Sequence, residues 1–215
     1  MISPYINARM TNKEFSCTAS PSRGRPREFD IDAALDKSVR VFRERGYHAT
    51  SIADLTQAMQ LASGSVYKAF KDKRAVFLAA FDREGKTRRE KLRRLLSTAK
   101  SGRDRLRIAL NFYAESSHGV EGKRGCLIVG TATELATFDS EVAQRVTAAL
   151  RQCETLVVDL IRQGQADGSV PAALDSRVTA RLMLCLLQGM RVIGKTGRSR
   201  KEMMAVADAA MKLLG

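Results

Sequence analysis

The chain is poor in the residues that build metal sites and disulfide frameworks. It contains two histidines, His48 and His118, and four cysteines, and no two cysteines form a CxxC pair. This scarcity argues against a zinc site and against the disulfide scaffold of a small secreted protein. We therefore expect neither a metal nor a cofactor.

Long apolar runs and catalytic signatures are also missing. No stretch reaches the length of a membrane-spanning helix or of the apolar core of a signal peptide, so we expect a cytoplasmic protein with no membrane partner. There is no glycine-rich phosphate loop, zinc-protease motif or supported Ser/His/Asp arrangement. The carboxylates Glu115, Glu121 and Glu134 are scattered along the chain. We do not expect an enzyme.

Basic residues, in contrast, are abundant and unevenly spread. The formal net charge is +14, and residues 1–100 contain 21 Lys and Arg against 11 Asp and Glu. Such an excess suits a DNA partner, because neutralising phosphates releases condensed counterions. The run KTRREKLRR at 86–94 is predicted to be a solvated helix face, since charge runs usually are.

Helical periodicity continues almost to the end of the chain, with no strand-like alternation. The pattern predicts an all-α protein of about nine helices, broken at glycines and opened by Asp or Ser caps. The first three helices lie between residues 30 and 71, and the later ones are expected at 72–100, 102–117, 124–137, 139–167, 175–195 and 199–214.

The segment 50–73, TSIADLTQAMQLASGSVYKAFKDK, has the outline of a helix-turn-helix. Apolar Ile52, Leu55 and Met59 recur at helical spacing on its first helix, and the second helix packs through Val66 and Phe70. The other face of the second helix carries short or hydrogen-bonding side chains, as a helix in a major groove requires. These are Ser63, Gly64, Ser65, Tyr67 and Lys68.

From residue 24 to 81 the chain resembles the DNA-binding domain of the tetracycline-repressor (TetR/AcrR) family of bacterial transcription factors. The resemblance rests on the first helix at 30–45, the GYHATSI turn that follows it, and the SGSVYKAFKDK segment. Thr50 or Ser51 would cap the next helix, where a DNA phosphate is also favoured. The resemblance further implies phosphate contacts from Tyr67 and Lys73, with base edges near Ser63, Gly64, Ser65 and Lys68.

Three positions depart from the family pattern. Gln60 stands in the turn where the family usually has glycine, which is favoured wherever φ is positive. Ala62 replaces the usual hydroxyl at the cap of the recognition helix, and Ala69 replaces the histidine or tyrosine often found before the final phenylalanine. A non-glycine residue in the turn costs on the order of 1 kcal/mol, which a packed domain tolerates.

We divide the chain into a disordered basic tail at 1–22, a helix-turn-helix domain at 23–71, and a helical effector-binding and dimerisation domain at 72–215. Three arginines precede the first helix, in SRGRPR: Arg23, Arg25 and Arg27. An extended arginine arm can enter a minor groove. The alternative is a loose basic tail that makes only phosphate contacts.

The last two expected helices, 175–195 and 199–214, are unusually apolar for a surface pair. A monomer cannot easily hide that much apolar surface, so we expect a homodimer through them. The family places its two-fold interface there, which implies paired recognition helices and a near-palindromic operator. The alternative is that these helices only complete the core.

The helices between these two regions are candidates for binding a small-molecule effector. We expect the pocket lining from apolar and aromatic positions, although such positions are more often core. The candidates are Phe112, Tyr113, Cys126, Leu127, Thr131, Leu135, Phe138, Leu156, Met183 and Leu187.

Cys126 differs from the other cysteines because it follows Lys123 and Arg124 at an expected helix start. Such surroundings can favour a reactive thiolate. The segment RGCLIVGTATE at 124–134 resembles a branch of the family that includes electrophile and oxidant sensors. Cys126 is thus a redox candidate, with simple packing as the alternative; Cys153 and Cys185 are expected to be small buried hydrophobes, and Cys17 lies in the tail.

The sequence predicts a dimeric, sequence-specific transcriptional regulator that binds double-stranded DNA. We expect a repressor that a small molecule, or modification of Cys126, releases from its operator. An architectural DNA-binding protein that responds to no ligand is the alternative, and an enzyme is a distant third.

Overall fold

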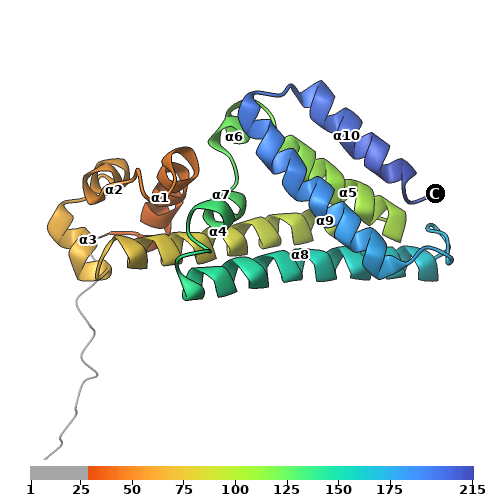
Figure 1. Ribbon diagram of the computed structural model, residues 1–215, viewed down its shortest axis with the longest axis horizontal. Helices are drawn as coiled ribbons and strands as arrows, with labels where there is room; N and C mark the ends of the chain where they lie inside the picture. Colours follow the sequence, from red (N-terminus) through yellow and green to blue (C-terminus); the bar gives the residue numbers. More distant parts are fainter. Residues whose placement is uncertain (1–28) are drawn as a thin grey trace, which may run out of the picture.

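The computed structural model describes residues 29–215 and contains helices but no strand within that range. This confirms the predicted all-α class (Figure 1). The helices, in chain order, are α1 (Ile31–Arg45), α2 (Ile52–Met59), α3 (Ser63–Ala69), α4 (Lys73–Leu96), α5 (Gly102–Glu115), α6 (Gly119–Arg124), α7 (Leu127–Glu134), α8 (Ser140–Ala166), α9 (Ser176–Ile193), the 3-10 helix η1 (Gly194–Thr196) and α10 (Arg200–Lys212). The expected arm residues Arg23, Arg25 and Arg27 lie outside the described residues, as does Cys17.

The first three helices form a small lobe against the start of α4, at the left of Figure 1. The apolar positions that predicted the helix-turn-helix are its core, with Phe42, Leu55, Val66 and Phe77 fully buried. The Asp30 carboxylate caps α1, and Ser51 forms a capping box with Asp54 at the start of α2. Side-chain caps of this kind satisfy backbone N–H groups that a helix start leaves unpaired.

Two long helices connect this lobe to the rest of the molecule. α4, of 24 residues, begins in the lobe and ends against α5, and α8, of 27 residues, runs alongside it (Figure 1). Ion pairs tie their neighbouring ends together: Arg74 of α4 binds Asp139 and Glu141, and Arg145 of α8 binds Asp82. The lobe is thereby fixed to a rigid helical frame.

A second apolar core lies among α5, α8, α9 and α10, at the right of Figure 1. It buries many of the apolar positions on the last two helices that predicted a dimer surface, including Met190, Met203, Ala207, Met211 and Leu214. These residues complete the core of one chain, so they contribute no surface to a partner. Other apolar positions on the same helices stay exposed and are described below.

The expected single helix at 124–137 is wrong in its boundaries. Of this range, α7 covers only residues 127–134. The short helix α6 lies in the interruption expected between the helices at 102–117 and 124–137, and Gly125 and Cys126 separate it from α7. Gly125 has φ of 82°, a left-handed conformation that glycine adopts without strain, and Cys126 is extended. The sequence predicted an interruption before residue 124, but not the helix α6 within it or the later start of α7, and these positions determine much of the site described next.

Among the helices of residues 29–215, none combines the length and apolarity needed to cross a bilayer. Within the same range, no group of three or more His, Cys, Asp or Glu side chains is arranged to hold a metal ion.

Candidate nucleic-acid interface and effector cavities

The outer face of α3 carries four exposed residues of the predicted recognition set. Ser63, Gly64, Tyr67 and Lys68 are exposed, Tyr67 to 53%, whereas Ser65 is half-buried. Space is open around Gly64, because a Cβ atom built there meets no heavy atom within 4 Å. α3 therefore presents a small, hydrogen-bonding surface with one basic group, which suits the floor of a major groove.

The turn between α2 and α3 is held in an unfavourable backbone conformation. Gln60 has φ of 61°, the one positive φ at a non-glycine residue in the described range. The lysine of α1 compensates, since the Lys37 ammonium donates hydrogen bonds to the Met59 carbonyl and the Gln60 side-chain carbonyl oxygen at 3.3 and 3.0 Å. The glycine-like geometry expected at Gln60 is thus present. Ala62 gives α3 no side-chain cap, as its sequence also implied.

Two residues predicted to contact DNA, Thr50 and Lys73, make hydrogen bonds within the protein. Thr50 is only 1% exposed, and its hydroxyl donates to the Gly46 carbonyl. Ser51 alone caps α2, so the expected choice between Thr50 and Ser51 falls on Ser51. The Lys73 ammonium lies over the Tyr47 ring and donates to the carbonyls of Tyr47 and Thr50 at 3.0 and 2.9 Å. Lys73 therefore anchors α4 to the loop before α2.

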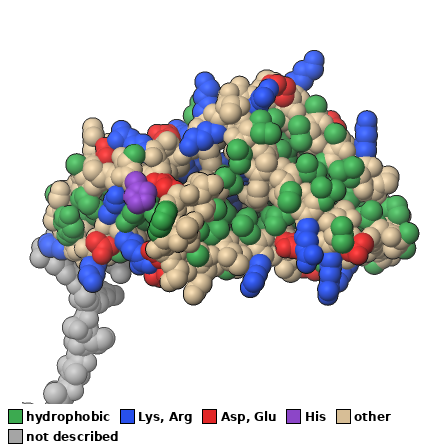
Figure 2. Space-filling view, viewed as in Figure 1, with side chains coloured by type: hydrophobic (Ala, Val, Ile, Leu, Met, Phe, Trp, Pro, Cys, Tyr) green, Lys and Arg blue, Asp and Glu red, His purple; other side chains and the backbone are tan. Residues whose placement is uncertain are grey.

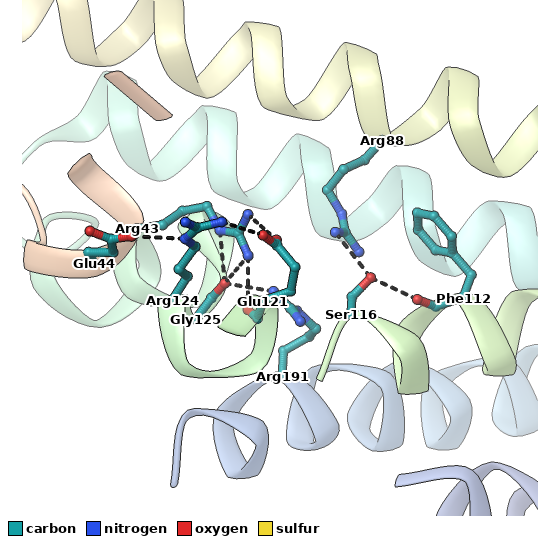
Figure 3. A network of polar contacts seen from close by, with 9 residues as sticks. All are labelled: Arg43, Glu44, Arg88, Phe112, Ser116, Glu121, Arg124, Gly125 and Arg191. Atoms are coloured by element: carbon teal, nitrogen blue, oxygen red, sulfur yellow. Dashed lines mark hydrogen bonds and ion pairs between the residues drawn. The ribbon is translucent and has the colours of Figure 1, made fainter. Parts of the chain in front are cut away.

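A network of buried guanidinium groups joins the lobe to the helices behind it (Figure 3). Arg43 of α1 is 9% exposed and donates twice to the Gly125 carbonyl, at 3.0 and 2.9 Å. It also donates to a Glu121 carboxylate oxygen at 2.9 Å and to the Glu121 carbonyl at 3.1 Å. Arg191 of α9 donates to the same Gly125 carbonyl, and Arg124 bridges Glu121 to Glu44 of α1. One peptide between α6 and α7 thus holds both α1 and α9.

The charges of this network are imperfectly balanced. Burial raises the pKa of Glu121, but hydrogen bonds from Arg124 and Arg43 outweigh it and the pKa is lowered overall. Arg191 is 2% exposed, and two of its nitrogens, Nε and Nη1, have no hydrogen-bond partner among the described residues. Burial lowers the pKa of Arg191, because a desolvated charge is disfavoured. The interior here is positive.

A second contact to the lobe comes from the end of α7. The Glu134 carboxylate accepts hydrogen bonds from the backbone N–H groups of Tyr47 at 2.9 Å and His48 at 2.6 Å. A Cβ atom at Gly46, where φ is 81°, would lie 2.6 Å from that carboxylate, so only glycine fits. Any movement of α7 must therefore act on the loop that precedes α2.

A cavity of about 340 Å³ opens where these elements meet, between α1, α7 and α9. Figure 2 shows the molecule hollowed between its two ends, with basic side chains at the hollow. Three of the predicted effector residues line this cavity, namely Cys126, Leu127 and Thr131, together with Arg43, Glu134 and Arg191.

A second cavity, of about 220 Å³, lies between α4, α5 and α8. Phe112, Tyr113 and Leu156 of the predicted effector set line it. The remaining candidates lie elsewhere: Leu135, Met183 and Leu187 are packed in the two cores, and Phe138 is 84% exposed just after α7. Sequence periodicity did not separate these roles, because core and cavity positions share it.

The three cysteines within the described residues have different surroundings. Cys126 is partly exposed at the N-cap of α7. Cys153 is half-buried, its sulfur lies 3.4 Å from the Tyr113 hydroxyl, and burial raises the pKa of its thiol. Cys185 is exposed, which corrects the expectation that it is buried.

An apolar stripe remains uncovered on the last two helices. On α9 it follows one face through Val178, Leu182 and Val192, exposed to 61%, 47% and 52%. On α10, Val206 and Leu213 are also exposed. Val178 and Leu182 are four residues apart, and Val206 and Leu213 are seven apart, spacings that place side chains on one side of a helix, as at a helix-to-helix seam.

Arg43, Arg191 and Glu134 were not among the residues predicted from the sequence. Their partners lie far away along the chain, with 82 positions between Arg43 and Gly125 and 87 between Tyr47 and Glu134. No local spacing motif announces such contacts. The clue available was the clustering of Arg124 and Gly125 beside Cys126, which marked the segment but not its partners.

Two family profiles match the chain. Residues 34–80 match the profile described as bacterial regulatory proteins, tetR family, and residues 102–210 match the tetracyclin repressor-like C-terminal domain. Together they cover the helix-turn-helix and most of the helices behind it.

Several characterised relatives are similar over nearly their whole length. The HTH-type transcriptional repressor ComR of Escherichia coli (strain K12) is 30% identical over 193 residues, which are 89% of this chain and 92% of ComR. A solved structure of the TetR family regulator CifR, a cysteine mutant complexed with 26-base-pair operator DNA, is 30% identical with a TM-score of 0.76, covering 89% of this chain and all of that one. FadR of Bacillus subtilis in complex with stearoyl-CoA is 17% identical with a TM-score of 0.68, covering 86% and 97%, and shares the fold.

Proposed function

The chain belongs to the tetracycline-repressor family of bacterial transcriptional regulators, and on this premise we propose that it is a homodimeric repressor of a palindromic operator. The repressor is released by a small molecule or by modification of Cys126. Residues 23–71 bind DNA in this proposal, and residues 72–215 bind the effector and form the dimer. The supporting observation is the exposed, sterically open face of α3 on a lobe tied to two effector cavities.

DNA reading is assigned to the outer face of α3. Ser63, Gly64 and Lys68 approach base edges, and Tyr67 and the capping region around Ser51 bind phosphates. Gly64 supports this assignment because the fold does not need a glycine there: it has a helical conformation and open space around it. Close approach of a partner such as DNA would explain a glycine at a position where the fold itself does not require one.

The exposed stripe of α9 and α10 is assigned to the dimer. Val178, Leu182 and Val192 present the kind of continuous apolar surface that a lone soluble chain covers with a partner. A two-fold axis along this stripe would place one α3 helix from each chain on successive turns of one DNA face.

Signal transmission is assigned to the junction between α6 and α7. Cys126 lines the 340 Å³ cavity beside Arg191, and the adjacent Gly125 carbonyl holds Arg43 of the lobe. A bulky or charged adduct on the Cys126 sulfur would press on these contacts. The test is operator release by hypochlorite in wild-type protein and in Cys126→Ser; equal release would assign Cys126 to packing.

Substitution of Gly64 separates a DNA-reading role from a structural one. Gly64→Ala should stabilise the free protein by about 0.5–1 kcal/mol, because alanine favours a helix, and yet weaken operator binding. Gly130→Ala on α7, a helical glycine with equally open space, is the matched control and should stabilise without weakening DNA binding. Unchanged operator affinity in Gly64→Ala would remove α3 as the close-contact element.

The dimer is tested by sedimentation. Leu182→Glu should yield monomers that lose tight operator binding, whereas Val120→Glu, at a more exposed apolar position on α6, should remain dimeric. Dimers that persist in Leu182→Glu would place the interface elsewhere.

A further inference from the structure

The 220 Å³ cavity has apolar walls and one unusual polar group. Leu92 and Leu96 of α4, Phe112 of α5 and Leu150 and Leu156 of α8 form much of its lining. Arg88 of α4 also lines it, although its run at 86–94 was predicted to face solvent. Arg89 and Arg93 of the same run also line the cavity, but their side chains are exposed. Arg88 is the one basic residue of the run that is partly buried.

The Arg88 guanidinium is held flat by aromatic rings but poorly satisfied by hydrogen bonds. Its central carbon lies 4.8 Å from the Phe112 ring centre and 5.5 Å from that of Tyr113. Nη1 reaches the Ser116 hydroxyl only at 3.5 Å, and that hydroxyl donates its own proton to the Phe112 carbonyl (Figure 3). Nη2 is buried with no partner among the described residues. The two N–H groups of Nη2 are thus available to a ligand.

No carboxylate balances this charge. Neither Asp nor Glu lines the cavity. The other charged residues of the lining, Arg89 and Arg93, have the same sign. A guanidinium nitrogen that is buried without a hydrogen-bond partner or a counter-ion is costly, and a bound anion would relieve that cost.

A second buried polar group in the cavity lining, on Gln188, also lacks a hydrogen-bond partner within residues 29–215. The side-chain carbonyl oxygen of Gln188, on α9, is buried in the cavity lining without a hydrogen-bond donor. It can accept a hydrogen bond from a ligand N–H or O–H group. The Tyr113 hydroxyl is already paired with Cys153 at 3.4 Å. The cavity therefore presents one buried cationic nitrogen, on Arg88, one unpartnered acceptor, on Gln188, and largely apolar walls. Its lining also includes the exposed Arg89 and Arg93.

We propose that this cavity binds a small organic carboxylate with an apolar body, its carboxylate on Arg88 and a hydroxyl or amine donor on Gln188. The inference deepens the proposed function, since it names the chemical class of the effector. A larger polar anion is disfavoured by the small volume and by the apolar walls away from the arginines of α4, because polar groups there would lose hydration without partners.

The probes are 4-hydroxycinnamate, cinnamate and 4-hydroxycinnamamide, added to the full-length chain without DNA and followed by calorimetry and thermal shift. The hydroxylated carboxylate should bind most tightly, and its neutral amide at least about tenfold more weakly, as loss of a charged hydrogen bond predicts. Equal binding of acid and amide, or binding of neither acid, would overturn the proposal.

Three variants test the assigned contacts. Arg88→Met retains the apolar stem and should lose carboxylate binding about tenfold or more. Arg94→Met, an exposed arginine of the same helix outside the cavity, should bind as wild type does. Gln188→Leu should bind cinnamate normally but lose the preference for the hydroxylated acid. Unchanged carboxylate binding in Arg88→Met would overturn the assignment.

Operator binding by the same variants keeps this test separate from the proposed function. Arg88→Met should bind operator as wild type does but fail to respond to 4-hydroxycinnamate. If the protein bound the carboxylate through Arg88 but recognised no operator, the proposed function would fail while the cavity assignment stood.

Discussion

Arg43 joins the DNA-binding lobe to the effector helices, and its removal should destabilise the whole chain. Arg43→Met retains the apolar stem but removes four hydrogen bonds, two to the Gly125 carbonyl and two to Glu121. Breaking a buried pair costs about 3–5 kcal/mol when the partner is left buried and alone.

The structure reduces that figure for Arg43. Glu121 is half-exposed and keeps its bond to Arg124, and the Gly125 carbonyl keeps Arg191. Removing one cation also relieves repulsion on Arg191, whose pKa Arg43 helps to lower. We therefore expect a loss of about 2–3 kcal/mol, at or just below the lower limit of that range. In a chain of this size the corresponding fall in Tm is about 5–10 °C.

The assay is urea unfolding by circular dichroism, with thermal unfolding beside it. Arg45→Met is the matched control, because Arg45 lies on the same helix as Arg43 and also forms an ion pair, with Asp54 of α2. The Arg45 side chain is 55% exposed, and exposed pairs contribute about 0–1 kcal/mol. A loss in Arg43→Met no larger than in Arg45→Met would show that the junction holds the lobe weakly, and would refute the reasoning.

Three further predictions concern other parts of the molecule. Gln60→Gly should stabilise the chain by about 0.5–1 kcal/mol despite losing the Lys37 bond, since a left-handed backbone favours glycine; chemical denaturation measures it, and destabilisation would contradict it. The Arg74 guanidinium lowers the pKa of Asp139 to about 2 in the folded chain. The ionised Asp139 therefore stabilises the fold at pH values above its unfolded pKa, and this contribution should vanish as the pH falls from about 4 to 2. Asp139→Asn should flatten stability over that interval, and a slope equal to wild type would argue against the pair. Lys68→Ala should weaken operator binding and reduce the dependence of log affinity on log salt by about 1 if Lys68 contacts a phosphate, but not if it reads a base.

Local sequence signals predicted the secondary structure well where helices have clear caps and periodic apolar faces. The capping box at Ser51 and the glycine-like turn at Gln60 could be anticipated because both depend on residues adjacent in sequence. A turn ending near Gly125 was predicted, but α6 was missed and the next helix was expected three residues too early. The conformation at Gly125 is stabilised by Arg43 and Arg191 from distant helices, which local sequence signals do not indicate.

The candidate sites could be predicted only in part, because they too depend on contacts between residues that are distant in sequence. The exposed face of α3 follows from one helix and could be read from spacing. Arg88 could not, since it belongs to a basic run whose other members are solvated, and only the packing of α4 on α5 turns its side chain over Phe112. Likewise, the exposure of Phe138 depends on where α7 ends.

The most direct test of the account is selection from fragmented genomic DNA of the source organism, incubated with purified full-length protein at about physiological salt and then sequenced. A specific dimeric regulator should retain one or a few palindromic sites, and retention should be lost in Leu182→Glu. Indiscriminate retention that disappears as salt rises would contradict the account and favour an architectural protein bound by charge alone.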